Sequence, residues 1–338
     1  MEVGILLSDL PTRVPAAEHF DSVLRQVEAA QRNGITYVML GQHFLFPGTR
    51  WLQPVPLLAR LAGELDRSVR LATSVMLAPL YHPVLLAEEL ATLDIVSEGR
   101  LIVGLGTGYV PEEFEALGVP FGERVARLEE CVALLEALWG GDRVTFEGQF
   151  WTLRDMPVHL RPVQQPRPPL WIGAIGRPGV RRAARIGDAW LITPTAEAAD
   201  VVSMVELFAA ERARLGKPMG HQPLRREIVV GADRADAAAR AAVMGREWYQ
   251  SMVDIGSPRF GPGGELATIE DFVRTGFVVG SPEECVREIR EIADAVPVDP
   301  VVTRAHWPGM STEQAVDYID SLGRELVPLL REVEPLSR

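Results

Sequence analysis

The feature that most constrains the fold of this chain is a regular alternation of short apolar runs with longer amphipathic runs. The apolar runs have the length of buried strands, and the runs between them have helical spacing of apolar residues. We expect strands at 3–7, 35–40, 69–77, 101–105, 170–174, 189–192, 226–231 and 300–304. We expect the main helices at 16–33, 57–65, 83–97, 122–139, 179–186, 196–215, 234–249, 281–293 and 312–331. Strands that alternate with helices form parallel sheets, and eight such units favour a (β/α)8 TIM barrel over a doubly wound open sheet.

Two segments interrupt the alternation as insertions. Residues 143–153 have the pattern of a small hairpin with its turn at 147–149. Residues 254–268 are rich in Gly and Pro, including Pro258, and contain few apolar residues that could anchor them. Long irregular segments in compact domains are often functional, so we expect a mobile loop that closes over a site and excludes water. No linker composition separates the rest, which predicts a single domain over residues 1–338.

Charge and composition exclude several classes of function. The chain carries 46 acidic and 34 basic residues, a formal net charge of −12, which disfavours binding to nucleic acid or to anionic membranes. No apolar stretch approaches the roughly 20 residues of a membrane span, and the N-terminus lacks a signal-peptide pattern, so we expect a cytoplasmic protein. Cys131 and Cys285 are expected to be buried hydrophobes. Neither they nor the histidines have metal-ligand spacing, so no metal site is predicted.

In a (β/α)8 barrel, function gathers where the strands end at the C-terminal face. Glycines at 104, 106 and 108 resemble half of a dinucleotide-binding fingerprint, but no helix opens at once after them. They are better explained by close approach of the backbone to a flat ligand, or by a tight turn. Residues 176–179 open a helix with Arg177 beside its start, a weak pattern for binding phosphate.

Titratable side chains at the same face leave structural and catalytic interpretations open. His43 and His82 stand at strand or helix ends, where a histidine is often only hydrogen-bonded structure. Glu112 and Glu113 could act as acids or bases, or could stabilise a helix start. No Gly-x-Ser-x-Gly motif is present, which disfavours a serine hydrolase.

Motifs spread over most of the chain resemble those of the bacterial luciferase-like flavin-dependent oxidoreductases. They lie at 69–75, 82–83, 86–94, 99–101, 104–114, 171–173, 182–188, 280–284 and 308–310. The resemblance implies a TIM barrel that binds FMN, or the deazaflavin coenzyme F-420, at its C-terminal face. The motifs are specific to the superfamily and not to a substrate.

The resemblance also implies roles for individual residues. Ser74 and Val75 match the place of a non-proline cis peptide under the flavin ring. A loop contacting the flavin phosphate and ribityl chain is matched by Thr107, Gly108 and Tyr109. The phosphate-binding helix start is matched by Gly176, Arg177 and Gly179.

One position departs from the luciferases, in which a catalytic histidine follows the second strand. Gln42 stands at that place, followed by His43. An amide cannot act as a general base, so we expect His43 to take the acid/base role and Gln42 to orient groups near it.

These considerations favour an FMNH2-dependent monooxygenase that acts on a small organic substrate and receives reduced flavin from a separate reductase. The alternatives are an F-420-dependent hydride-transfer oxidoreductase and a non-catalytic barrel that binds flavin or a hydrophobic ligand. We further expect a homodimer.

Overall fold

Eight parallel strands form the central barrel in the computed structural model, which describes residues 1–7, 10–11, 13–257 and 259–336. Hydrogen bonds join them in the order β11-β10-β7-β5-β3-β1-β15-β12. The ring closes between β11 and β12 through one bridge, Ile192 to Leu224. The strands are β1 (Val3–Leu7), β3 (Tyr37–Leu40), β5 (Arg70–Thr73), β7 (Leu101–Gly106), β10 (Leu170–Gly173), β11 (Ala189–Leu191), β12 (Gln222–Arg225) and β15 (Val298–Arg304). The predicted (β/α)8 barrel is confirmed.

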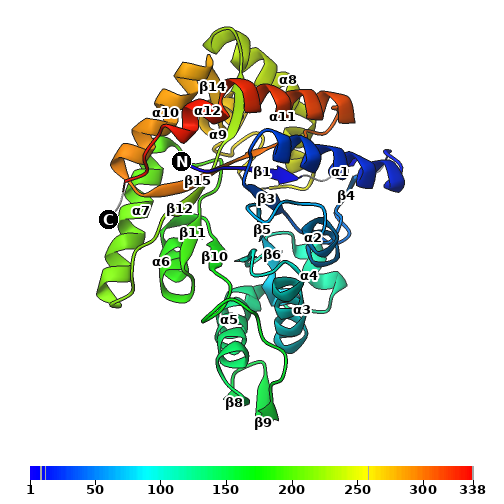
Figure 1. The fold of residues 1–338 in the computed structure, drawn as a ribbon, viewed down its shortest axis with the longest axis vertical. Coiled ribbons are helices and arrows are strands. Elements are labelled where there is room, and N and C mark those ends of the chain that lie inside the picture. Colours follow the sequence, from blue (N-terminus) through cyan, green and yellow to red (C-terminus); the bar gives the residue numbers. More distant parts are fainter. Residues whose placement is uncertain (8–9, 12, 258, 337–338) are drawn as a thin grey trace.

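Helices surround the strands on the outside of the barrel (Figure 1). They are α1 (Ala16–Arg32), α2 (Pro54–Ala62), α3 (Pro83–Val96), α5 (Arg124–Gly140), α6 (Gly176–Ile186), α7 (Ala198–Arg214), α10 (Pro282–Ala295), α11 (Thr312–Glu325) and α12 (Val327–Arg331). Short elements lie in the connections: β2 (Leu10–Pro11), β4 (Thr49–Arg50), β6 (Met76–Leu77), α4 (Pro111–Ala116) and the 3-10 turns η1 (Ala78–Leu80) and η2 (Phe121–Glu123). The fifth predicted helix, α6, begins at Gly176, three residues earlier than expected.

The seventh strand was predicted wrongly at 226–231. The seventh barrel strand is β12, whereas β13 (Glu227–Val230) pairs with β14 (Phe277–Gly280) in a separate parallel sheet of two strands. Hydropathy favoured β13 because its apolar run is the stronger one. β12 carries Gln222 and Arg225, and the buried Gln222 side chain accepts a hydrogen bond from the Trp190 backbone N–H at 2.8 Å. Because a buried polar side chain interrupts the apolar run, the sequence pattern does not indicate a strand at β12.

A second core lies beneath the insertion between β13 and β14. The insertion consists of α8 (Arg234–Asp254), the segment 255–268 and α9 (Ile269–Gly276). Phe272 stacks on Trp248 with ring centroids 5.2 Å apart, and Phe260 packs edge-on against Trp248 at 5.5 Å. Leu266 is buried in the same cluster. Phe260 and Leu266 are thus the apolar residues that hold 254–268 to α8 and α9. Pro258 lies outside the described residues.

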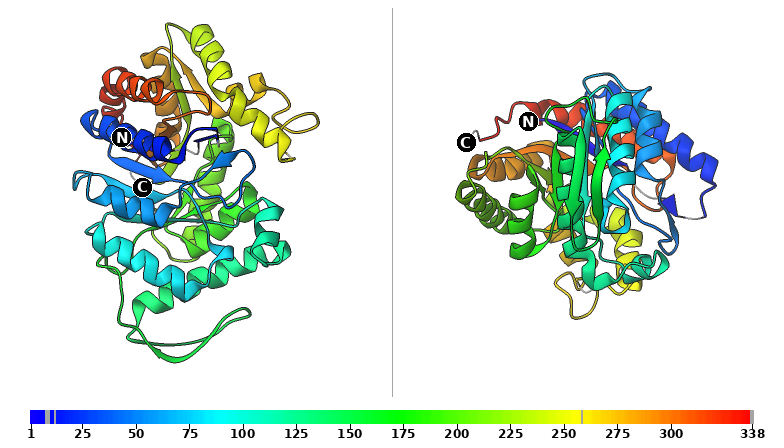
Figure 2. Two further views of the ribbon diagram at one scale, coloured as in Figure 1. Left: turned by 90° about the vertical axis from the view of Figure 1, so that its right-hand side faces the viewer. Right: turned by 90° about the horizontal axis from the view of Figure 1, so that it is seen from below.

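The predicted hairpin is present and projects from the barrel at the bottom of Figure 1. It comprises β8 (Arg143–Glu147) and β9 (Thr152–Pro157), so its second strand extends beyond the predicted end. The Glu130 carboxylate, on α5, accepts backbone N–H groups of Gln149, Phe150 and Trp151 at 2.8–3.2 Å. One side chain of the barrel layer thus holds the turn, and Figure 2 shows the projection from two further sides.

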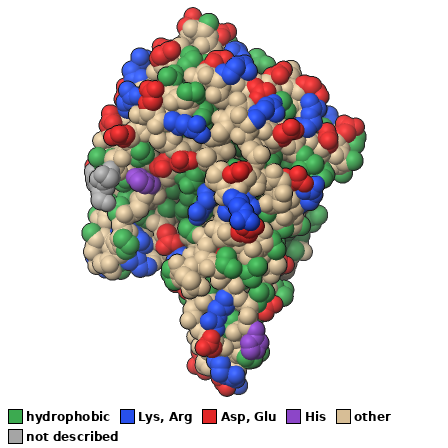
Figure 3. Space-filling view, in the orientation of Figure 1, with side chains coloured by type: hydrophobic (Ala, Val, Ile, Leu, Met, Phe, Trp, Pro, Cys, Tyr) green, Lys and Arg blue, Asp and Glu red, His purple; other side chains and the backbone are tan. Residues whose placement is uncertain are grey.

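Both cysteines behave as the sequence predicts. Cys131 and Cys285 are fully buried, and burial raises the pKa of each thiol to about 12. Thiolates are therefore scarce at neutral pH, and these residues contribute packing. None of the described helices has the length and apolarity needed to cross a membrane. Acidic and basic side chains are interspersed on the face shown in Figure 3.

Candidate active site

A buried histidine–carboxylate pair lies just beyond the C-terminal end of β3. The Nδ1 atom of His43 is 2.9 Å from Oε1 of Glu113, whose side chain comes from α4. The same oxygen accepts the backbone N–H of Phe44 at 2.6 Å. Only 8% of His43 and 2% of Glu113 is exposed. Glu113 lies in the first turn of α4, and its carboxylate contacts His43, a residue 70 positions away in the sequence.

Three aromatic rings enclose the imidazole of His43. The ring centroids of Phe46, Trp51 and Tyr109 lie 4.6, 4.7 and 5.4 Å from that of His43. The Tyr109 hydroxyl lies 3.3 Å from Nε2 of His43. Both imidazole nitrogens therefore have a protein partner, which fixes the ring's orientation.

Gln42 is held by protein groups on all sides. Its Nε2 donates to Oε1 of Gln53 at 2.8 Å and to the Tyr81 hydroxyl at 2.5 Å, and its Oε1 accepts the Leu77 backbone N–H at 2.9 Å. Gln53 in turn donates to the carbonyl of His43 at 3.1 Å. Burial raises the pKa of the Tyr81 phenol, which the hydrogen bond from Gln42 opposes. This amide network positions the backbone of His43, as an orienting role for Gln42 requires.

The peptide bond between Ser74 and Val75 is cis, as the resemblance implied. The glycines around it have a different cause from the one expected. A Cβ on Gly104 would lie 1.9 Å from the Thr73 carbonyl oxygen, and one on Gly106 would lie 2.5 Å from the Val75 side chain. The expectation that these two glycines make room for a flat ligand is corrected, because their close neighbours are parts of the protein itself.

The loop after β7 contains Thr107, Gly108 and Tyr109. Gly108 has φ +73°, and a Cβ there would lie 2.8 Å from the Phe114 ring. This conformation and this contact both require glycine. The turn leaves Tyr109 half exposed and directs its hydroxyl to His43.

The start of α6 is open to solvent. Gly176 has φ +71°, and the nearest atom to a Cβ there would be Cδ of Pro178 at 4.0 Å. Arg177 is exposed beside it, while Gly179 is buried and would meet Ala174 at 2.9 Å if it carried a Cβ. Of the two glycines and one arginine predicted for the phosphate site, Gly176 and Arg177 face solvent and Gly179 serves packing.

Three buried polar atoms near the strand ends have no hydrogen-bond partner among the described residues. They are Oγ of Ser74, Nε1 of Trp51 and Oε2 of Glu113. Trp51 also covers Gly41, since a Cβ on that glycine would lie 2.8 Å from the Trp51 ring. Unsatisfied buried groups are costly unless a ligand or water completes them. Hydropathy gave no signal for Trp51, Gln53 or Tyr81, because their contacts with the 42–43 pair depend on how the connections fold and not on a periodic pattern.

The other histidines at this face have structural roles. His82 is the N-cap of α3 and accepts the Val84 backbone N–H at 3.3 Å. His306 is buried, with Gln26 3.2 Å from Nδ1 and the Met310 carbonyl 3.0 Å from Nε2. Within the described ranges, no three His, Cys, Asp or Glu side chains converge to hold a metal ion.

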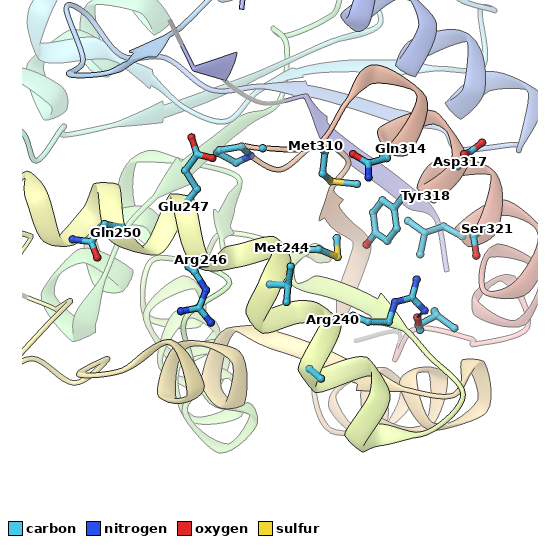
Figure 4. Close-up of a pocket in the computed structure, with 16 residues that line it drawn as sticks. Arg240, Met244, Arg246, Glu247, Gln250, Met310, Gln314, Asp317, Tyr318 and Ser321 are labelled. Atoms are coloured by element: carbon cyan, nitrogen blue, oxygen red, sulfur yellow. Dashed lines mark hydrogen bonds between the residues drawn. The ribbon is translucent and has the colours of Figure 1, made fainter. Parts of the chain in front are cut away.

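A large groove lies away from this pair. It has a volume of about 1120 Å³ and lies between α8 and α11, as Figure 4 shows. Met244 from α8, Met310 from the preceding loop and Tyr318 from α11 line it. None of the site residues predicted from the sequence lines this groove.

Comparison with known proteins places the chain in a family. A family model described as luciferase-like monooxygenase matches residues 1–298. The chain belongs to the luciferase-like monooxygenase family. Its similarity to an F-420-dependent hydroxymycolic acid dehydrogenase of Mycobacterium tuberculosis is 29% identity, over 94% of this chain and 85% of that one. An FMNH2-dependent dimethylsulfone monooxygenase of Pseudomonas putida is 24% identical, over 98% and 93% respectively.

A solved structure is also similar over nearly its full length. A monooxygenase from Streptomyces bottropensis superposes with a TM-score of 0.82 at 26% identity, covering 97% of this chain and 99% of that one. Relatives of this luciferase-like chain thus use FMNH2 or coenzyme F-420, and the chain is an oxidoreductase of this superfamily.

Proposed function

We propose that the chain is the oxygenase component of a two-component FMNH2-dependent monooxygenase acting on a small organic substrate. The observation that carries this proposal is the His43–Glu113 pair, buried beside polar atoms that lack partners. A flavin, when bound, supplies electron transfer to oxygen, and the protein supplies binding, orientation and proton transfer. A separate reductase would provide the reduced flavin.

The residues present fit a flavin. The backbone N–H groups at the start of α6 are approachable, since the nearest atom to a Gly176 Cβ position is Cδ of Pro178 at 4.0 Å, and Arg177 adds a positive charge. Such a helix start favours phosphate. The unpartnered Ser74 hydroxyl, beside the cis peptide, offers a hydrogen bond to a ring placed over β5.

His43 would hold the proton that the reaction needs. With Glu113 accepting from Nδ1–H, the imidazole presents Nε2 as its acceptor; this tautomer is assigned from the contacts. A positive imidazolium formed at this position would be stabilised by the buried carboxylate of Glu113. The aromatic rings around it exclude water, which strengthens that interaction.

Titration with FMN and with F-420 tests the choice of cofactor. We expect oxidised FMN to bind with micromolar affinity and F-420 to bind more weakly, as measured by quenching of flavin fluorescence. The reason is charge: the acidic tail of F-420 needs several basic groups, and among the described residues of the first turn of α6 only Arg177 is basic. Tighter binding of F-420 would instead identify a hydride-transfer enzyme, and binding of neither would favour a non-flavin barrel.

The hydride-transfer alternative has one observation in its favour. Arg181 follows Arg177 by one helical turn of α6, both are exposed, and neither forms an ion pair with a described residue. Arg177→Ala should weaken the binding of both FMN and F-420. Arg181→Ala is the matched control: it should leave FMN affinity unchanged and weaken F-420 only if an acidic tail runs along α6.

A further inference from the structure

We propose that the indole N–H of Trp51 is the hydrogen-bond donor that selects the substrate, and that the substrate is an apolar organic molecule carrying a carbonyl-type oxygen. Trp51 thereby determines specificity and transfers no proton. The use of this contact in turnover rests on the proposed function, whereas the binding preference is a property of the protein without flavin.

The donor is a buried group for which the described part of the chain supplies no acceptor. Nε1 of Trp51 is buried and forms no hydrogen bond with a described residue. An indole nitrogen can only donate, so only an acceptor atom satisfies it. The buried indole of Trp139 donates to the Ala87 carbonyl at 3.2 Å. That of Trp190 donates to the Ala174 carbonyl at 2.9 Å. The fold thus satisfies these two buried indoles, whereas the N–H of Trp51 is left for a ligand.

Trp51 lies at the mouth of the barrel, beside the groups already assigned to the site. Its ring meets that of His43 edge-on, with the ring centroids 4.7 Å apart. The benzene edge of the indole covers the end of β3, since a Cβ on Gly41 would lie 2.8 Å from Cζ3 of Trp51. The same position is 3.4 Å from the Ser74 carbonyl oxygen. A molecule bound to Nε1 would therefore lie near both His43 and the cis peptide bond that follows Ser74.

The side chains packed around Trp51 are apolar. Phe46, Val110 and Met252 form a buried cluster, and both Trp51 and Phe260 pack against it. These residues come from the connections after β3 and β7, from α8 and from the segment that follows α8. Such surroundings favour the apolar body of a ligand, and an unpaired charge among them would be costly. The substrate that fits them is uncharged and apolar apart from the atom that accepts the Trp51 N–H.

The ligand reaches Trp51 where the predicted lid covers it. Ile255 and Phe260, in the segment 254–268, pack against the same apolar cluster, so opening of this segment uncovers the indole. A buried N–H without an acceptor is costly, and a ligand oxygen that accepts it recovers that cost. We expect this oxygen to raise affinity about tenfold over a ligand of the same shape that lacks it.

NMR of the indole groups in the flavin-free protein, with two probes of one shape, tests the proposal. Cyclohexanone carries a carbonyl oxygen where methylenecyclohexane carries a CH2 group. Cyclohexanone should shift the nitrogen-15 and proton resonances of the Trp51 N–H downfield and bind about tenfold more tightly than methylenecyclohexane. The resonances of Trp139 and Trp190 are internal controls, because these N–H groups already have carbonyl partners and should not move.

Trp51→Phe keeps an aromatic ring and removes the N–H, and the resonance lost in this variant assigns Trp51. We expect the two probes to bind the variant with equal affinity. Trp151→Phe, in the hairpin, is the matched control and should retain the tenfold preference, and melting curves should show that both variants are folded. If Trp51→Phe does not fold, the comparison of the two probes on the wild-type protein decides alone.

Three results would overturn the proposal: equal affinity of the wild-type protein for both probes, no binding of cyclohexanone, or a preference that survives in Trp51→Phe. A Trp51 resonance that responds to FMN and not to cyclohexanone would assign the N–H to the flavin and would also overturn it. Tighter binding of F-420 than of FMN would contradict the proposed function alone and leave substrate selection by Trp51 standing.

Discussion

His43 is the residue whose replacement most directly tests the chemistry. His43→Ala removes the imidazole between Glu113 and Tyr109, and we expect turnover to fall roughly 10²-fold or more while flavin affinity changes little. Steady-state kinetics with a flavin titration measures both. If the residue were only structural, the variant would lose thermal stability and keep its turnover.

Gln42→Ala is the companion variant. The sequence alone predicts weaker substrate binding, but the Gln42 side chain is hydrogen-bonded to Gln53, Tyr81 and the Leu77 backbone. We therefore expect a lower melting temperature, by an amount corresponding to about 1–3 kcal/mol for the partners left unsatisfied. Unchanged stability with a raised KM would support the original interpretation.

Replacing Gly104 tests whether the protein's own packing requires glycine at this position. Gly104→Ala would place a Cβ 1.9 Å from the Thr73 carbonyl oxygen, which is backbone and cannot turn aside. We expect the free energy of unfolding to fall by about 3 kcal/mol or more. Gly140→Ala at the end of α5 is the control, with no atom within 4 Å of its Cβ, and should change stability by less than about 1 kcal/mol. Chemical denaturation of both variants measures the difference.

Single residues were predictable where the signal was local. Gly176 and Arg177 lie at a helix start, and the motif around Ser74 and Val75 marked a cis peptide. Trp51 and Tyr81 carry no local signal, because they matter only through contacts across the barrel mouth. The role of Glu113 depended on a partner 70 residues away.

At the scale of elements, the apolar pattern located the strands with apolar side chains and missed a strand that buries a polar one. Strands such as β10 and β11 are apolar throughout and were found at nearly the right bounds. β12 was missed because a buried glutamine replaces an apolar side chain. α9 was missed because it is only 8 residues long, although Thr268 and Asp271 form a capping box at its start. A capping box can thus indicate a helix that is too short for its apolar pattern to reveal it.

The segment 254–268 remains a predicted lid. Limited proteolysis should cut there first, and bound flavin should slow the cutting. The anchors found here add a sharper test: Leu266→Ala removes a buried side chain and should speed cleavage several-fold. The exposed Val243, on α8, supplies the control Val243→Ala. Cleavage elsewhere, without any effect of cofactor, would count against the lid.

At the scale of the whole molecule, the predicted homodimer needs an apolar surface. α3 exposes Leu85 (62%), Ile95 and Val96, and a groove of about 360 Å³ lies between α2 and α3. We expect two copies to associate through this face. Leu85→Glu should yield monomers in sedimentation velocity, whereas Val243→Glu, on α8, should not. A wild-type monomer at all concentrations would contradict the prediction.

The closure of the barrel has a consequence for how the molecule comes apart. Every neighbouring pair in the ring shares a ladder except β11 and β12, which meet at one bridge beside the Gln222 side chain. The ring of strand ladders is thus continuous except at this single bridge between β11 and β12. Rupture of the few bonds at Ile192 separates two edges without breaking any other ladder, so local opening costs least free energy there. In folding, we expect formation of this bridge between Ile192 and Leu224 to be the step that closes an open twisted sheet into a barrel.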